Sequence, residues 1–128
     1  MSTYNFDKNA SVITIDVFLE NNGNQKKIRM ALDTGATYVM IPWEIAKALD
    51  LKPELSEEKI EMITTSGVEN VPLVKLDIVK VTDKKAKDVK AIVHDLPSRS
   101  YVDGLLGLSF LRNFNIRMNF MEGILELE

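Results

Sequence analysis

The sequence predicts a single all-β domain, mainly strands with one or two short helices. Many short segments of alternating polarity follow one another along the chain, separated by Gly, Pro, Asn or Asp residues. The length of 128 residues suits one domain, and 45% hydrophobic and 27% charged residues are ordinary values for a globular protein. We expect residues 1–10 to be a polar N-terminal segment and residues 11–128 to form the domain.

The first part of the chain predicts a hairpin, a short strand and a helix. Residues 11–19 and 26–32 carry alternating apolar side chains, and the turn-forming residues 21–24 lie between them. The apolar residues 38–41 predict a further strand. A helix is expected to open at Pro42, since proline needs no backbone N–H at the first helical position, and to be ended by residues 50–53.

The middle of the chain predicts a second hairpin and another strand. The arms of this hairpin are residues 59–64 and 71–81, with Thr65-Ser66-Gly67 at or near the turn between them. The charged residues 83–87 predict a turn, and residues 88–93 predict the next strand.

The last part of the chain predicts an irregular segment, a glycine turn, a short helix and a terminal hairpin. Residues 96–103 have no regular period, and residues 104–107 predict a buried apolar turn. A helix capped by Ser109 is expected to run through Phe114. Residues 116–120 and 124–127 predict two strands around a Glu-Gly turn.

One Asp-Thr-Gly motif, Asp33-Thr34-Gly35, directly follows the apolar end of an expected strand. It places one carboxylate on a tight turn, where the glycine allows another backbone to approach closely. Aspartic proteases use two such carboxylates, which lie side by side and share a proton. This chain contains the motif once, so two copies of the chain must meet if the motif is to be catalytic.

With these residues, the chain resembles the single-lobe retropepsin-like aspartic proteases. Asp33-Thr34-Gly35-Ala36 matches the catalytic loop of that family, and Leu105-Leu106-Gly107 matches the apolar-apolar-Gly loop behind it. The run from Leu105 to Phe120 keeps the family order of glycine turn, short helix and strand ending in Asn-Phe. The resemblance extends from about Val12 to Leu127, and it implies a closed acid-protease barrel of one lobe.

The resemblance implies a role for each residue of the motif. Asp33 and its copy from a second chain would form a dyad that activates water, and the Thr34 hydroxyl would bond across the dimer axis. Gly35 would bring its backbone near the substrate, and residues 105–107 would support the loop. Ala36 stands where many two-lobed enzymes carry Ser or Thr, so no hydroxyl there donates to a carboxylate, and we expect activity at weakly acidic pH.

The second expected hairpin matches the flap that closes over the substrate in this family. Its tip is expected within Thr64, Thr65, Ser66, Gly67 and Val68, where the glycine allows a φ that other residues resist. Flap closure would exclude water from the dyad. The resemblance implies an extended peptide or protein substrate and a homodimer, with no metal and no organic cofactor. An ordinary exposed hairpin is the alternative for this segment.

The chain departs from the retroviral pattern at two places. Thr37 and Leu108 stand where retroviral enzymes commonly carry a paired Asp and Arg, so the loop must be braced in another way. Residues 121–128 continue beyond the Asn-Phe pair as a returning strand, which leaves the strand arrangement of the dimer interface open. The same fold could instead serve as a catalytically silent dimerisation or peptide-binding module.

The composition of the chain and its remaining residues argue against several other kinds of function. The net charge of −3 argues against a nucleic-acid partner, and no apolar run is long enough to cross a membrane. There is no Cys, and the polar start of the chain does not read as a signal peptide, so we expect a cytoplasmic protein. The single histidine, His94, predicts a surface or strand-end residue rather than a zinc ligand or part of a triad. Tyr38 and Trp43 are expected in core or hinge packing.

Overall fold

The structure is a computed structural model that describes residues 2–128. Within these residues, strands account for most of the regular structure, and two short α-helices and one 3₁₀ turn complete it, which confirms the predicted fold class. The strands are β1 (Ser2–Asn5), β2 (Thr14–Asn21), β3 (Asn24–Leu32), β4 (Val39–Ile41), β5 (Lys59–Thr64), β6 (Gly67–Val81), β7 (Lys84–Val93), β8 (Gly104–Leu106), β9 (Ile116–Asn119) and β10 (Ile124–Leu127), and the helical elements are α1 (Trp43–Ala48), η1 (Pro53–Leu55) and α2 (Leu108–Leu111).

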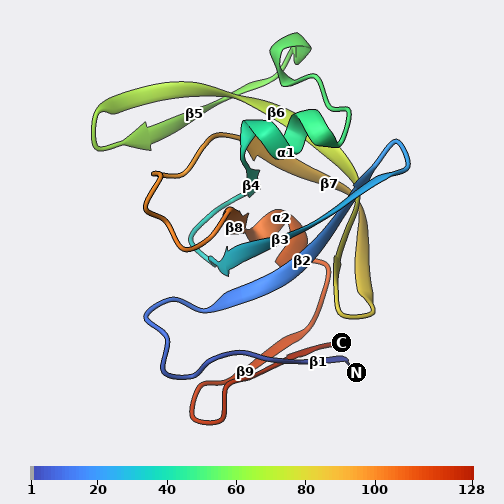
Figure 1. The fold of residues 1–128 in the computed structure, drawn as a ribbon, viewed down its shortest axis with the longest axis vertical. Coiled ribbons are helices and arrows are strands. Elements are labelled where there is room, and N and C mark those ends of the chain that lie inside the picture. Colours follow the sequence, from blue (N-terminus) through green and yellow to red (C-terminus); the bar gives the residue numbers. More distant parts are fainter. Residues whose placement is uncertain (1) are drawn as a thin grey trace.

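Six strands close into a barrel, as the resemblance implies (Figure 1). Their order is β2-β3-β8-β4-β7-β6, and pairing of β2 with β6 closes the ring. β5 extends the sheet beyond β6 and forms with it the long hairpin at the top of Figure 1. Closure gives each barrel strand a partner on both sides.

The first hairpin shows how alternation in the sequence builds this barrel. Ile15, Val17 and Leu19 of β2 are buried in the core, whereas the residues between them face outward or are only partly buried. The turn between β2 and β3 has positive φ at Asn22 (49°) and Gly23 (78°), as a two-residue turn that matches the strand twist requires. The predicted hairpin is therefore confirmed, with arms that lie a few residues closer to the turn than expected.

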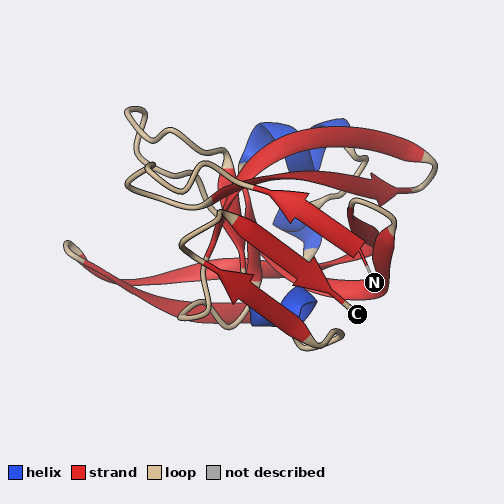
Figure 2. Cartoon of the chain, turned by 90° about the horizontal axis from the view of Figure 1, so that it is seen from below, coloured by secondary structure: helices blue, strands red, loops and turns tan. Residues whose placement is uncertain are grey.

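A separate three-stranded sheet, in the order β1-β10-β9, lies below the barrel in Figure 1. Seen from below in Figure 2, it forms a layer in front of the barrel strands, with the N and C labels at its end. Leu125 and Leu127 of β10 are 1% exposed and belong to the main core. The backbone N–H of Asp16 donates to the Tyr4 hydroxyl at 2.9 Å, which joins this sheet to the barrel.

Several predicted boundaries are wrong, each for a physical reason. Residues 2–5, inside the expected polar N-terminal segment, form a strand that the sequence did not predict, because they pair with β10 along their length. β7 begins at Lys84 rather than at residue 88, since its charged residues pair with β6 and point outward. Similarly, β6 begins at Gly67 rather than at residue 71, directly after the turn.

Candidate active site

The end of β3 positions the carboxylate of Asp33. The backbone N–H of Asp33 donates to the carbonyl of Leu106 at 3.1 Å, and the Ala36 N–H donates to the Asp33 carbonyl at 3.2 Å. The N–H of Gly35 donates to Oδ1 of Asp33 at 2.9 Å. Asp33 is half-buried, whereas Thr34 and Gly35 are exposed. The carboxylate is thus held in one orientation at the surface, with a backbone donor on one oxygen.

β8 lies directly behind this loop, between β3 and β4. It runs parallel to β3, with Leu105 opposite Ala31, and antiparallel to β4, with Leu105 opposite Met40. The sequence predicts a turn at residues 104–107, but residues 104–106 are extended because each side of this segment has a strand to pair with. Leu106 and Gly107 lie against the loop that carries Asp33, and the supporting role of residues 105–107 stays a prediction.

The glycine that follows β8 allows the two segments to approach closely. A β-carbon built at Gly107 would lie 2.4 Å from the carbonyl oxygen of Tyr38 and 2.7 Å from that of Ala36. Real β-carbons do not approach carbonyl oxygens so closely, so only glycine fits between α2 and the loop. The requirement for glycine at position 107 is therefore steric.

Ser109 is a structural residue of the site that sequence reasoning misassigned. The sequence predicts that it caps a helix through Phe114, but α2 spans Leu108–Leu111 and has no side-chain cap. Instead, the Ser109 hydroxyl accepts the N–H of Val39 at 2.8 Å and donates to the carbonyl of Lys90 at 2.7 Å. It thereby joins α2 to β4 and β7. The signal in the sequence is a small hydroxyl residue two positions after a glycine, which does not distinguish these roles.

Backbone bonds brace the loop at the two positions that depart from the retroviral pattern. The N–H of Leu108 donates to the carbonyl of Ala36 at 2.8 Å, and the N–H of Ser109 donates to the carbonyl of Thr37 at 3.0 Å. The side chain of Leu108 packs against the main core. The loop is therefore attached to the start of α2 without a charged pair.

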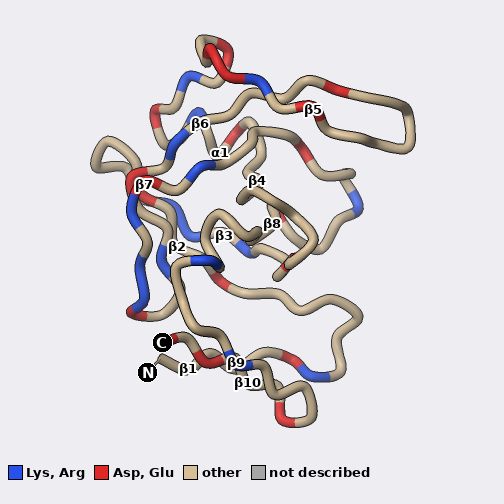
Figure 3. Tube along the Cα trace, turned by 180° about the vertical axis from the view of Figure 1, so that it is seen from behind, with Lys and Arg blue, Asp and Glu red and all other residues tan. Residues whose placement is uncertain are grey.

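The β5–β6 hairpin has its turn inside the segment predicted for the flap tip. Thr64 pairs with Gly67, which leaves Thr65 and Ser66 as the connecting residues, and Gly67 has φ of 125°. The Thr64 hydroxyl donates to the Gly67 carbonyl at 3.0 Å. Figure 3 shows that this tip is free of charged residues. An uncharged, glycine-containing tip can contact a peptide without placing an unpaired charge beside it.

Two apolar residues are exposed next to this turn. Ile63 and Val68 lie opposite each other on the two arms and are 86% and 63% exposed. Such exposure of a matched apolar pair has no stabilising effect within the single chain. The pair is therefore a candidate for contact with another molecule.

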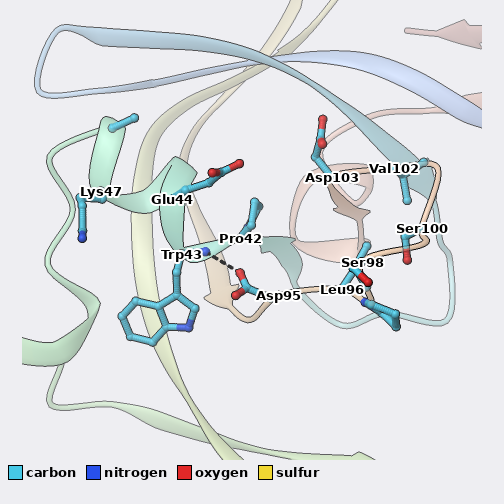
Figure 4. A pocket seen from close by; sticks show the side chains of 12 residues that line it. Pro42, Trp43, Glu44, Lys47, Asp95, Leu96, Ser98, Ser100, Val102 and Asp103 are labelled. Carbon is cyan, nitrogen blue, oxygen red and sulfur yellow. Dashed lines mark hydrogen bonds between the residues drawn. The ribbon is translucent and has the colours of Figure 1, made fainter.

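A cavity of about 850 Å³ lies between α1 and residues 95–103 (Figure 4). The backbone N–H of Trp43 donates to Oδ1 of Asp95 at 3.0 Å, which ties the start of the helix to this irregular segment. Trp43 is 39% exposed and lines the cavity, so it does not pack in the core, and its alternative role in hinge packing stays a prediction. Tyr38 packs against the smaller apolar cluster around Met40, as expected.

His94 follows the end of β7, and its Nε2 lies 3.7 Å from a carboxylate oxygen of Glu69 on β6. This position confirms the prediction of a strand-end residue. Within residues 2–128, no group of three or more metal-binding side chains lies together. The same described residues include no helix long and apolar enough to span a membrane.

Comparisons with known proteins agree with this geometry. A family model described as "gag-polyprotein putative aspartyl protease" matches residues 19–113, which is most of the chain, and the protein belongs to this retropepsin-like family. The fold is similar to the crystal structure of a retropepsin-like aspartic protease from Rickettsia conorii, with a TM-score of 0.72, 24% identity and 98% of each chain covered. No curated protein matches the chain.

Proposed function

We propose that the protein is an aspartic endopeptidase whose active site forms between two copies of the chain, each of which supplies Asp33. The observation that carries this proposal is a single, half-buried carboxylate on the loop after β3, oriented by the N–H of Gly35 and backed by β8. Membership of an aspartyl protease family supports the same chemistry. One carboxylate per chain makes a second copy necessary for the dyad.

Two equivalent carboxylates at hydrogen-bond distance share one proton, because both cannot be ionised comfortably so close together. In the proposed mechanism the ionised member takes a proton from a bound water, and the protonated member hydrogen-bonds the carbonyl of the scissile peptide bond. The water oxygen attacks the carbonyl carbon and forms a tetrahedral diol. The dyad then passes a proton to the leaving nitrogen as the C–N bond breaks.

The substrate in this proposal is an extended peptide that lies between the dyad and the β5–β6 hairpins. Extended peptides bind largely through backbone hydrogen bonds, with pockets for alternate side chains. The exposed Ile63 and Val68 would cover the peptide from above. The exposed hydroxyl of Thr34 would bond across the dimer axis and hold the two loops together.

The decisive experiment compares the wild type with Asp33→Asn on a peptide library over a range of pH, with the oligomeric state followed by sedimentation. Asn preserves the shape of the side chain but cannot take up a proton from water, so cleavage should disappear while folding and dimerisation persist. Cleavage that survives in the variant would exclude the mechanism. A dimeric wild type that binds peptides but cuts none would instead indicate a binding module.

A further inference from the structure

The outward face of the barrel carries a row of four side chains on the neighbouring strands β3, β2, β6 and β7. Residues that lie directly opposite each other in a sheet point to the same side of it. Lys27 of β3 lies opposite Phe18 of β2. Phe18 also lies opposite Lys80 of β6, which lies opposite Lys85 of β7. Residues from separate parts of the chain therefore form one line across the barrel.

An exposed aromatic ring lies between positive charges in this row. Phe18 is 42% exposed. The Nζ of Lys80 lies over its ring at 5.2 Å from the centroid, and the Nζ of Lys27 lies at 6.0 Å. Ammonium groups are attracted to the face of an aromatic ring at such distances. The two lysines therefore stay beside Phe18, where their charges border an apolar surface.

The fold does not neutralise the lysines around this ring. The basic face consists of Phe18, Lys27, Lys80, Lys85 and Lys87, and Figure 3 shows basic segments along β7. Within residues 2–128, the ion pairs involve Lys75 and His94 instead. The carboxylate of Glu20, two residues along β2 from Phe18, accepts a hydrogen bond from Nε2 of Gln25 at 2.7 Å. The basic face thus presents free positive charge, although the whole chain has a net charge of −3.

The pairing of β6 with β7 places like charges directly opposite each other. Lys80 lies opposite Lys85, and Lys75 lies opposite Lys90 further along the same two strands. Like charges in these positions destabilise a sheet. A negatively charged ligand on the basic face would remove the repulsion between Lys80 and Lys85.

A depression of about 210 Å³ lies beside the aromatic ring. Phe18 and Ile78 give it apolar surface, and Lys80 and Lys85 also line it. It is smaller than the pockets of about 300–1,000 Å³ that hold drug-sized ligands. Its size therefore suits one apolar side chain of a larger partner.

The dimensions of the row match an extended peptide. Neighbouring strands lie about 4.8 Å apart, so the row from Lys27 to Lys85 spans about 14 Å. Alternate residues of an extended peptide point to one side and lie about 6.8 Å apart, so three of them span about 14 Å as well. A peptide laid across the strands would place its central apolar side chain at Phe18 and a carboxylate at the lysines on each side.

We propose that the basic face binds an extended acidic segment of a partner protein, in which two carboxylate residues each stand two positions from a central apolar residue. The ammonium groups over Phe18 occupy the place where a nucleic-acid base would stack, which disfavours a nucleic acid. The exposed carboxylate of Asp83, in the turn between β6 and β7, disfavours an anionic membrane surface.

The basic face lies away from the proposed active site. Asp33 follows Lys27 by six residues along β3, which corresponds to about 20 Å of extended chain. In Figure 1 the β2–β3 and β6–β7 turns lie on the right, whereas the end of β3 and the tip of the β5–β6 hairpin lie on the left. A partner held on the basic face would therefore leave Asp33 accessible, and its binding does not require the proposed protease activity.

NMR titration with a capped peptide of sequence Gly-Glu-Ser-Leu-Ser-Glu-Gly tests this proposal. The amide resonances around Phe18 on β2, β3, β6 and β7 should shift saturably, and the Kd should rise with salt because salt screens exposed charges. A peptide with Gln in place of both Glu residues should bind at least about tenfold more weakly. The reordered peptide Gly-Glu-Glu-Ser-Ser-Leu-Gly should also bind more weakly, and equal binding of these two acidic peptides would overturn the proposed spacing.

The Lys85→Glu variant separates binding from folding. It should raise the Kd of the first peptide by at least about tenfold, since a carboxylate then faces the carboxylates of the ligand. It should also raise the midpoint of thermal unfolding, because an opposite charge then faces Lys80. Lys8→Glu makes the same change at an exposed residue before β2 and should leave the Kd unchanged. Wild-type affinity in Lys85→Glu would overturn the proposal.

Two further measurements distinguish other ligands and the proposed active site. Binding of phosphatidylserine vesicles or of a twelve-residue oligothymidylate that Lys85→Glu abolishes, without any shift caused by the peptide, would overturn the assignment to a polypeptide. The peptide should have the same Kd for Asp33→Asn as for the wild type, and loss of binding in Asp33→Asn would overturn the proposal by placing the peptide at the dyad. Peptide cleavage decides the protease proposal independently.

Discussion

The backbone N–H of Asp33 donates to the carbonyl of Leu106, with 3.1 Å between nitrogen and oxygen. These residues lie far apart in the sequence, and the bond joins the end of β3 to the end of β8. Because β8 also pairs with β4 on its other side, both strands that flank the loop are fixed to the same segment. The position of the Asp33 carboxylate therefore depends on packing at residues 104–109 as much as on its own loop.

We expect the Gly107→Ala variant to be less stable than the wild type. Its methyl group would lie 2.4 Å from the carbonyl oxygen of Tyr38, a backbone atom that cannot move without shifting β4. Overpacking of this kind costs about 1–3 kcal/mol, and urea denaturation measures it as a lower midpoint at unchanged slope.

A second glycine supplies the matched control for this clash. Gly23 has φ of 78° and nothing within 4 Å of a built β-carbon. Gly23→Ala should therefore cost only the left-handed backbone penalty, about 1–2 kcal/mol, and leave activity intact. Peptide cleavage should fall in Gly107→Ala alone, and equal loss in both variants would contradict the steric argument.

Ser109→Ala should weaken both stability and activity. It removes the hydroxyl between the N–H of Val39 and the carbonyl of Lys90, and it leaves both backbone groups without their partner. The expected cost is about 1–3 kcal/mol in the free energy of unfolding. Because α2 carries the bonds to Ala36 and Thr37, displacement should also lower kcat/KM by about tenfold.

Ser98→Ala is the control for the loss of a serine hydroxyl. Ser98 is exposed in the irregular segment before β8, so its replacement should change the free energy of unfolding by less than about 0.5 kcal/mol. Ser109→Ala with wild-type stability and wild-type kcat/KM would show that α2 holds the loop without this side chain.

The local sequence pattern was sufficient to predict those strands and turns whose conformation is determined by their own residues. Residues 59–64 alternate over their whole length, and the structure has a strand with these bounds. The turn at Asn22-Gly23 follows from two residues that tolerate positive φ. Of the site, Asp33-Thr34-Gly35 is recognisable because one tight turn brings the three residues together.

The elements that the sequence did not predict depend on partners far along the chain. β1 has only four residues of mixed polarity, and it forms a strand because it pairs antiparallel with β10. The sequence of β8 alone predicts a glycine turn, but the segment is a strand because β3 and β4 pair with it on both sides. The bonds of Ser109 to Val39 and Lys90 likewise join three separate elements, so no local pattern could indicate them.

The contact between the Ser2 hydroxyl of β1 and the Thr82 hydroxyl in the β6–β7 turn should affect the titration of a neighbouring carboxyl group. The pKa of Asp83 lies below its ordinary value of 3.8, first because the Ser2 hydroxyl favours the charged carboxylate, and also because the Thr82 hydroxyl donates to Oδ1 and Lys84 is near. The depressed pKa adds stability that is present above the ordinary value and is lost as the pH falls through the lowered one.

Ser2→Ala should move the pKa of Asp83 up toward 3.8, as measured by NMR titration of its carboxyl resonance. The difference in stability between this variant and the wild type should shrink as the solution is acidified below that range. An unchanged titration curve would mean that the Ser2 hydroxyl does not reach Asp83 in solution.

Replacing the two exposed residues at the tip of the β5–β6 hairpin tests whether this tip binds substrate or stabilises the fold. Ile63 and Val68 are 86% and 63% exposed, so replacing both with serine should change the free energy of unfolding by less than about 0.5 kcal/mol. If they cover bound peptide, KM should rise by about tenfold at nearly constant kcat, because binding of substrate and transition state is weakened equally. Leu55→Ser is the control, since Leu55 is 70% exposed on η1, outside the β5–β6 hairpin. Steady-state kinetics on one cleavable peptide measure the difference, and a KM equal to that of the Leu55→Ser control would show that the tip does not touch the substrate.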